Sequence, residues 1–132
     1  MKTEYTEEKL PNVLSYLKDT SGIVNYCKEC KIPVYVTRNG TPEMVIMDAD
    51  FFDNYLSPYI IDGEIDVAKV LEYMPLFINI KALKNTGELS KRCSEAKNAI
   101  HIIKNGVGEL VIMSLEVYNN CKERALVALK NK

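Results

Sequence analysis

The sequence predicts an α+β fold in which two βααββα repeats form an intramolecular pseudo-dimer, with a shared antiparallel sheet flanked by helices. Residues 10–55 align with residues 76–121 without a gap, and 14 of the 46 positions are identical, where average residue usage gives roughly three identities by chance. Both repeats carry an Asn-Gly turn between two runs rich in β-branched residues. Symmetric homodimers are the commonest oligomers, and fusing two protomers preserves their interface.

Length and composition indicate a chain that folds. At 132 residues it can bury roughly two-thirds of its unfolded surface, whereas one repeat alone would be marginal. We expect residues 1–75 to hold the first repeat and an acidic connector, and residues 76–132 to hold the second repeat with a C-terminal amphipathic helix. No apolar run approaches the ~18 residues that span a bilayer. The acidic N-terminus has no signal-like segment, so we expect a cytoplasmic protein without a membrane partner.

The clearest element of the first repeat is a hairpin. Residues 34–37 and 43–47 flank Asn39-Gly40, a dipeptide that tolerates positive φ and favours tight turns. Asp48 or Asp50 is then placed to cap a shorter helix. A second helical stretch is expected over residues 65–74.

The second repeat opens with a predicted strand over residues 75–80, whose counterpart in the first repeat is interrupted by Pro11. Residues 81–96 show helical spacing of apolar side chains. Gly87 within that stretch is a possible break between two short helices.

A second hairpin and a terminal helix complete this repeat. Residues 99–103 and 109–113 flank Asn105-Gly106, again a strong turn signal. Ser114 is a good N-cap, and apolar residues recur at helical spacing over residues 115–129.

The second hairpin strand of each repeat carries Val-Ile-Met, at residues 45–47 and 111–113. Because consecutive apolar residues point to opposite faces, both faces of these strands must be covered. Helices of the same repeat can cover one face, and the other repeat can cover the other. We expect the two hairpins to form one continuous sheet, with residues 45–47 near residues 111–113.

The net charge of −1 hides a polarised chain. Residues 1–75 carry a balance of −6, and residues 76–132 carry a balance of +5. This asymmetry indicates a basic surface for an anionic partner, or complementarity between the halves. Divergence of two solvated faces is the alternative.

Catalysis has little support in the sequence. The one histidine is His101, and its repeat counterpart is Tyr35. The shared requirement is therefore an amphipathic side chain at a sheet surface, and no nucleophile or orienting carboxylate is recognisably placed around it. We expect no enzymatic activity.

Cys27 and Cys30 form a Cys-x-x-Cys pair, a spacing found in zinc and redox sites. Their repeat counterparts are Cys93 and Ala96, which places both positions on the buried stripe of a helix, where thiols act as small hydrophobes. A structural zinc needs four ligands and no second spaced pair is present. We expect neither a metal nor another cofactor.

Residues 102–106 and 109–118 form an Asn-Gly hairpin that continues into Ser114 and Tyr118, and residues 78–83 with Glu88-Leu89 precede it. The former residues resemble the hairpin signature of the Phd/YefM antitoxins, and the latter resemble the first strand and helix of that family. The first repeat keeps the hairpin but has Asp48 where the family has serine and Phe52 where it has tyrosine.

This resemblance implies an α+β unit whose hairpins join two protomers, and operator DNA bound by the region around the first helix. The matching DNA-binding residues of the second repeat are Lys81, Lys84, Asn85, Lys91 and Arg92. Their first-repeat counterparts are Ser15, Lys18, Asp19, Asn25 and Tyr26, of which only Lys18 is basic. Tight operator binding should therefore need two chains that both present their second repeat.

The resemblance also implies a toxin partner, often an RNA-cleaving enzyme. The two amphipathic segments, residues 60–74 and 115–129, are candidates to lie in a groove of the toxin. The predicted toxin-binding residues are Ile61, Ile65, Leu71, Tyr118, Leu126 and Leu129. The alternative is that both segments cap the sheet or join two chains.

The expected function is that of an antitoxin-like protein of a type II toxin–antitoxin system, which binds its cognate toxin and represses its own operon through operator DNA. We expect the pseudo-dimeric chain to form a homo-oligomer. Two alternatives are an orphan DNA-binding transcriptional regulator of the same fold and a degenerate oligomerisation scaffold.

Overall fold

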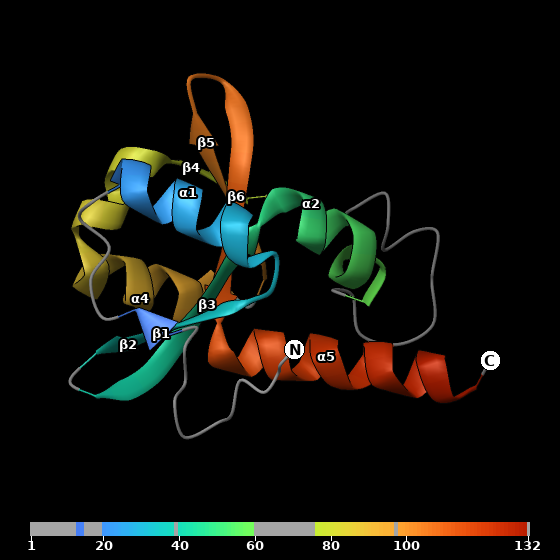
Figure 1. Cartoon of the computed structure of the whole chain (residues 1–132). Helices are drawn as coiled ribbons and strands as arrows, with labels where there is room; N and C mark the ends of the chain where they lie inside the picture. The colour runs from blue at the N-terminus through green and yellow to red at the C-terminus, as the bar shows by residue number, and fades with distance from the viewer. Residues whose placement is uncertain (1–12, 15–19, 39, 60–75, 97, 132) are drawn as a thin grey trace.

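The computed structural model describes residues 13–14, 20–38, 40–59, 76–96 and 98–131 of the chain (Figure 1). The first repeat contributes β1 (Val13–Leu14), α1 (Thr20–Cys30), β2 (Val34–Arg38), β3 (Thr41–Asp48), α2 (Ala49–Phe51), the π-helical turn η1 (Phe52–Leu56) and the 3-10 turn η2 (Ser57–Tyr59). The second repeat contributes β4 (Leu76–Asn79), the 3-10 helix η3 (Ile80–Lys84), α4 (Thr86–Ala96), β5 (Ile100–Lys104), β6 (Val107–Ser114) and α5 (Leu115–Lys130). The predicted α+β class is confirmed. The expected helix over residues 65–74 lies outside the described residues.

The strands form one six-stranded sheet in the order β1-β2-β3-β6-β5-β4. Equivalent strands of the two repeats therefore occupy equivalent places on either side of the centre. The prediction of an antiparallel sheet is wrong for the outer strands, since β1 pairs with β2 and β4 pairs with β5 in parallel. The physical reason is the connection: helical segments link these strands, and a crossover returns the chain in the same direction.

The two hairpins join along β3 and β6, which run antiparallel. Val45 pairs with Met113, Ile46 with Ile112 and Met47 with Val111. Ile46 and Ile112 are counterparts in the repeat, so the register is symmetric about this pair. The predicted contact of residues 45–47 with residues 111–113 is confirmed.

Both faces of the central strands are covered, as their consecutive apolar residues require. On one face α1, η3 and α4 enclose a core that contains Ile46 and Ile112, and on the other face α2, η1 and α5 enclose a core that contains Val45 and Met113 (Figure 1). We had expected helices of the same repeat on one face of these strands and the other repeat on the other face, and the structure differs in that neither face belongs to a single repeat. Because β3 and β6 are neighbours, a helix from either repeat reaches both strands, and each face receives helical segments from both repeats.

Local sequence explains the turns and helix starts. Asn105 and Gly106 have φ values of 53° and 80°, as the tight hairpin turn requires. Ser114 Oγ accepts a hydrogen bond of 3.1 Å from the Val117 amide, which confirms the predicted cap of α5. Asp48 precedes α2 but makes no side-chain cap. Its carboxylate instead binds Lys28.

A break between two helices was predicted at Gly87. The observed break, between η3 and α4, is at Asn85, two residues earlier. Gly87 itself lies in the first turn of α4. Within the described residues, no helix is long and apolar enough to cross a membrane.

Candidate functional site

The predicted DNA-binding cations lie on two successive helices of the second repeat, which Asn85 separates. Lys81 and Lys84 are on η3, and Lys91 and Arg92 are on α4. All four side chains are exposed. Exposed cations along one segment suit the phosphate backbone of a nucleic acid, which binds lysine and arginine without regard to sequence.

Asn85, the fifth predicted DNA-binding residue, caps a helix. Its Oδ1 accepts a hydrogen bond of 3.2 Å from the Glu88 amide, and its Nδ2 donates to Glu88 Oε1 at 3.5 Å. This reciprocal pair caps the N-terminus of α4. The spacing of Asn85 and Glu88 is that of a capping box, and this was the sequence signal for the cap.

The first repeat offers a different surface at the equivalent positions. Ser15, Lys18 and Asp19 lie outside the described residues, and Asn25 is exposed and neutral. Tyr26, in the place of Arg92, packs against the hydrophobic core that α1 covers. Burial, with a side-chain hydrogen bond to Cys30, raises the pKa of Tyr26 to about 12. The described part of the first repeat therefore lacks the cations that the second repeat presents.

The predicted toxin-binding residues of α5 divide into two groups. Tyr118 is buried, so the structure places it inside the protein and away from a partner's reach. Leu126 and Leu129 are 49% and 63% exposed, and Val127 between them is 56% exposed. The remaining predictions, Ile61, Ile65 and Leu71, lie outside the described residues.

The first part of α5 is tied to the end of the first repeat. The Cys121 thiol donates to the Leu56 carbonyl at 3.2 Å, and Arg124 Nε donates to the Tyr59 carbonyl at 2.7 Å. Beyond Arg124, the apolar side chains of α5 turn from buried to exposed. We name this exposed group, Leu126, Val127 and Leu129, the apolar end of α5.

Two aromatic contacts cross between the repeats and mirror each other. Tyr35 meets Tyr118 edge to face, with ring centroids 6.1 Å apart. His101, the counterpart of Tyr35, meets Phe52, the counterpart of Tyr118, with centroids 5.6 Å apart and an interplanar angle of 86°. A strand residue of each repeat thus packs on a helical residue of the other. The sequence comparison placed an amphipathic side chain at positions 35 and 101 but gave no partner for it.

His101 is half-buried and also contacts the ring of Phe77, with centroids 5.4 Å apart. Burial lowers the pKa of His101, and the carboxylate of Asp53 partly opposes this shift. The ring is therefore held as a neutral aromatic packing group.

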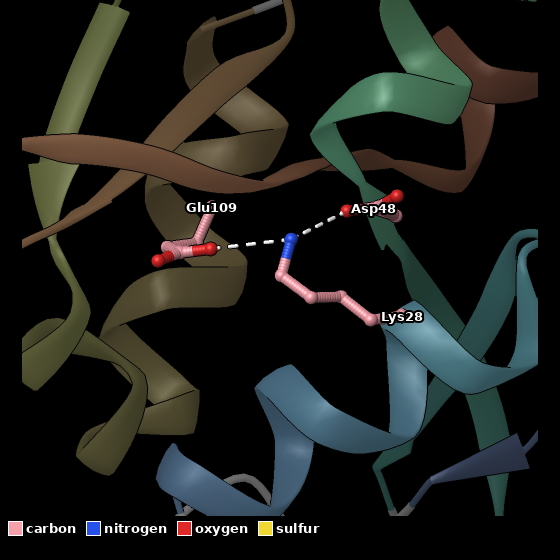
Figure 2. A network of polar contacts seen from close by, with 3 residues as sticks. All are labelled: Lys28, Asp48 and Glu109. Carbon is pink, nitrogen blue, oxygen red and sulfur yellow. Dashed lines mark hydrogen bonds and ion pairs between the residues drawn. The ribbon is translucent and has the colours of Figure 1, made fainter.

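An ion-pair network joins the repeats on the face of the sheet that α1 and α4 cover (Figure 2). Lys28 Nζ on α1 lies 2.9 Å from Asp48 Oδ1 at the end of β3 and 3.2 Å from Glu109 Oε1 on β6. The hydrogen bond to Asp48, followed by that to Glu109, raises the pKa of Lys28 against the lowering effect of burial. Sequence spacing gave no signal for this network, because its three residues meet only through the pairing of β3 with β6.

The cysteines behave as core residues. Cys27 and Cys93 are fully buried at equivalent places on α1 and α4, while Cys30 is half-buried. Burial raises the pKa of both buried thiols to about 12. Within the part of the chain that the structure describes, no group of three or more His, Cys, Asp or Glu side chains is placed to hold a metal.

No protein-family model, curated protein or solved structure matches the chain. Support for a function therefore comes from two surfaces of the described residues. One is the cationic segment of η3 and α4, and the other is the apolar end of α5.

Proposed function

We propose that the chain is a cytoplasmic antitoxin-like protein: a pseudo-dimer made from one chain, which neutralises a cognate toxin and represses its own operon. The symmetric register about Ile46 and Ile112 supports the pseudo-dimer. So do the mirrored aromatic contacts, in which each repeat places a strand residue on a helix of the other. Reciprocal contacts of this kind are typical of a two-fold interface.

The observation that carries the toxin proposal is the apolar end of α5. Leu126, Val127 and Leu129 are each about half exposed or more, although the same helix is anchored to the first repeat through Cys121 and Arg124. An anchored helix that extends an apolar surface suits insertion into a partner's groove. This helix directly follows the hairpin whose residues resemble the Phd/YefM signature.

The operator proposal rests on the exposed cations of η3 and α4. Among the residues that the structure describes, this cationic segment belongs to the second repeat. Each half-site needs its own reading surface, so a homo-oligomer of at least two chains is the form that we propose for tight operator binding.

The decisive experiment tests growth rescue. The product of the neighbouring reading frame is expressed alone, where we expect growth arrest, and then together with this chain, where we expect growth. Replacing Leu126 and Leu129 by serine should abolish rescue while leaving the amount of folded protein unchanged. The matched control replaces the exposed polar residues Glu123 and Lys130 of the same helix by serine and should retain rescue.

Full rescue by the leucine variant would contradict the proposed toxin surface. A neighbouring product that leaves growth unaffected would favour a second candidate, an orphan DNA-binding regulator. The exposure of all four cations on η3 and α4 is the observation that supports this candidate.

A further inference from the structure

The outer edge of β4 presents apolar side chains to solvent. Among the described strands β4 is the last in the sheet, so it pairs with β5 along one edge and with no described strand along the other. Leu76 is 37% exposed and Phe77 is 60% exposed. β4 contains neither a proline nor a charged residue, which are common devices that keep an edge strand from pairing with another chain.

The opposite edge of the sheet differs from β4. β1 has only two residues, Val13–Leu14, and very short edge strands resist pairing with another chain. The repeat counterpart of Phe77 is Pro11, a residue type that has no amide hydrogen to donate to a neighbouring strand. The second repeat thus has an exposed phenylalanine where the first repeat has a proline, and β4 is the edge that suits a further strand.

The residues of β4 suit pairing with a second copy of the same strand. Side chains of a strand alternate between the two faces of a sheet, and a two-fold axis perpendicular to the sheet keeps each side chain on its own face. Antiparallel pairing about such an axis at Phe77 sets the two Phe77 rings opposite each other and sets Leu76 opposite Ile78. Every one of these pairs is apolar. The centre of the sheet follows the same rule, because Ile46 lies opposite its repeat counterpart Ile112.

We propose that β4 pairs with β4 of a second copy of this chain, antiparallel and centred on Phe77, so that two six-stranded sheets become one. The Phe77 ring contacts His101 within its own chain, with centroids 5.4 Å apart, and its exposed part would be covered by the second Phe77. Aromatic pairs on neighbouring strands stabilise such pairing. A two-fold contact also closes after two chains, whereas pairing of β4 with β1 of another copy would continue into a filament.

This pairing specifies the homo-oligomer of the proposed function, and it rests on that function only for its role in operator binding. η3 and α4 cover one face of the sheet, and the axis keeps these helices of both copies on that same face. The dimer therefore presents two sets of the exposed cations on one side, as two half-sites of DNA require. These cations are Lys81, Lys84, Lys91 and Arg92. The dimer is measured without DNA or a toxin, so its failure can be told apart from failure of the proposed function.

The first test is sedimentation equilibrium of the intact protein, which should give twice the 15.0 kDa of one chain. Phe77→Lys should raise the dissociation constant of the dimer about tenfold or more, because each dimer loses two central aromatic side chains and gains like charges directly opposite each other. The matched control is Val107→Lys, which changes a 56% exposed residue of β6 in the same sheet. It should dimerise as the unchanged protein does.

Three outcomes of this test would overturn the proposal. The first is an unchanged protein that stays monomeric at its highest soluble concentration. The second is equal weakening in Phe77→Lys and Val107→Lys. The third is loss of the dimer on replacing Leu126 and Leu129 by serine but not in Phe77→Lys, which would place the contact at the apolar end of α5.

Cross-linking tests the register of the two strands. Residues directly opposite on antiparallel strands have Cβ atoms about 4.5–5.5 Å apart, near the range that a disulfide spans. In Phe77→Cys, copper(II)-phenanthroline should join the two new thiols, with two electrons passing to copper and two protons to water, and a covalent dimer should form. Leu76→Cys is the matched control and should stay monomeric on a denaturing gel, because its side chain lies opposite Ile78. The unchanged protein, treated alike, measures any reaction of the native cysteines. Equal cross-linking at the two positions, or none at position 77, would refute the pairing.

Discussion

Tyr35 and Tyr118 lie edge to face across the boundary between the two repeats, with an interplanar angle of 90°. Tyr35 belongs to β2 of the first repeat, and Tyr118 belongs to α5 of the second. Edge-to-face geometry places the positive rim of one ring against the negative face of the other. The pair therefore links the repeats by a directed contact as well as by buried area.

Replacing Tyr35 and Tyr118 by leucine, singly and together, should reveal a coupling energy of about 0.5–1.5 kcal/mol in the free energy of unfolding. Chemical denaturation of the four proteins of the cycle measures it. The control cycle joins Tyr118→Leu with Phe77→Leu, a residue that packs on His101. Its two effects should add, and an equal coupling in both cycles would refute a direct contact.

Lys28→Met keeps the aliphatic part of the side chain and removes the charge that Asp48 and Glu109 share. We expect the free energy of unfolding to fall by about 1 kcal/mol, the upper range for partly exposed ion pairs. Lys91→Met on α4 is the matched control and should have a smaller effect on stability. Because the pKa of Lys28 is raised in the folded state, its contribution is present at neutral pH and is lost as pH rises through that raised value. Equal losses in the two variants at pH 7 would argue against the network.

His101→Phe should remove one source of acid sensitivity. Burial lowers the pKa of His101 below its ordinary 6.5, so the unfolded chain binds more protons than the folded chain between those two values. Stability conferred by the neutral ring is therefore present above pH 6.5 and is lost as pH falls toward the folded pKa. Urea unfolding at pH 7.5 and 5.5 should show a smaller difference for the variant than for the unchanged protein. An identical difference would mean that His101 does not contribute to it.

Replacing Lys84 and Arg92 by alanine should weaken binding to DNA from upstream of the gene and flatten its salt dependence. Each lost phosphate contact removes about 0.9 from the slope of log affinity against log salt, so two contacts should remove about 1.8. Lys18→Ala in the first repeat should matter less. Equal losses from both repeats would show that the charge asymmetry has another cause. Absence of binding at low salt would leave the toxin-binding and scaffold alternatives.

Local signals predicted the hairpins and the cap of α5, because Asn105-Gly106 and Ser114 act within a few residues of the chain. The pairing of Val45 with Met113 also followed, since strands apolar on both faces must be central. The parallel direction of β1 and β4 was not predicted. It was within reach, because the helix expected over residues 81–96 is the kind of connection that joins parallel strands.

The burial and contacts of individual side chains were harder to predict than the positions of the strands. Helical spacing marks Tyr118 and Leu129 alike as apolar, but only the distance from the sheet decides that the first is buried and the second exposed. The Lys28 network needs Asp48 and Glu109 on neighbouring strands, so it follows only once the register is known. The role of Asn85 was within reach, because Glu88 follows it at the capping-box spacing.

The pairing of β3 with β6 has a consequence during synthesis on the ribosome. β3 leaves the exit tunnel well before β6 leaves it, since the paired residues Ile46 and Ile112 are 66 positions apart. At ~5–20 residues per second this interval lasts roughly 3–13 s. During that time Val45, Ile46 and Met47 form an open strand edge, the kind of surface that joins other nascent chains. Slow translation of the second repeat should therefore favour aggregation, and a chaperone that covers β3 should relieve it.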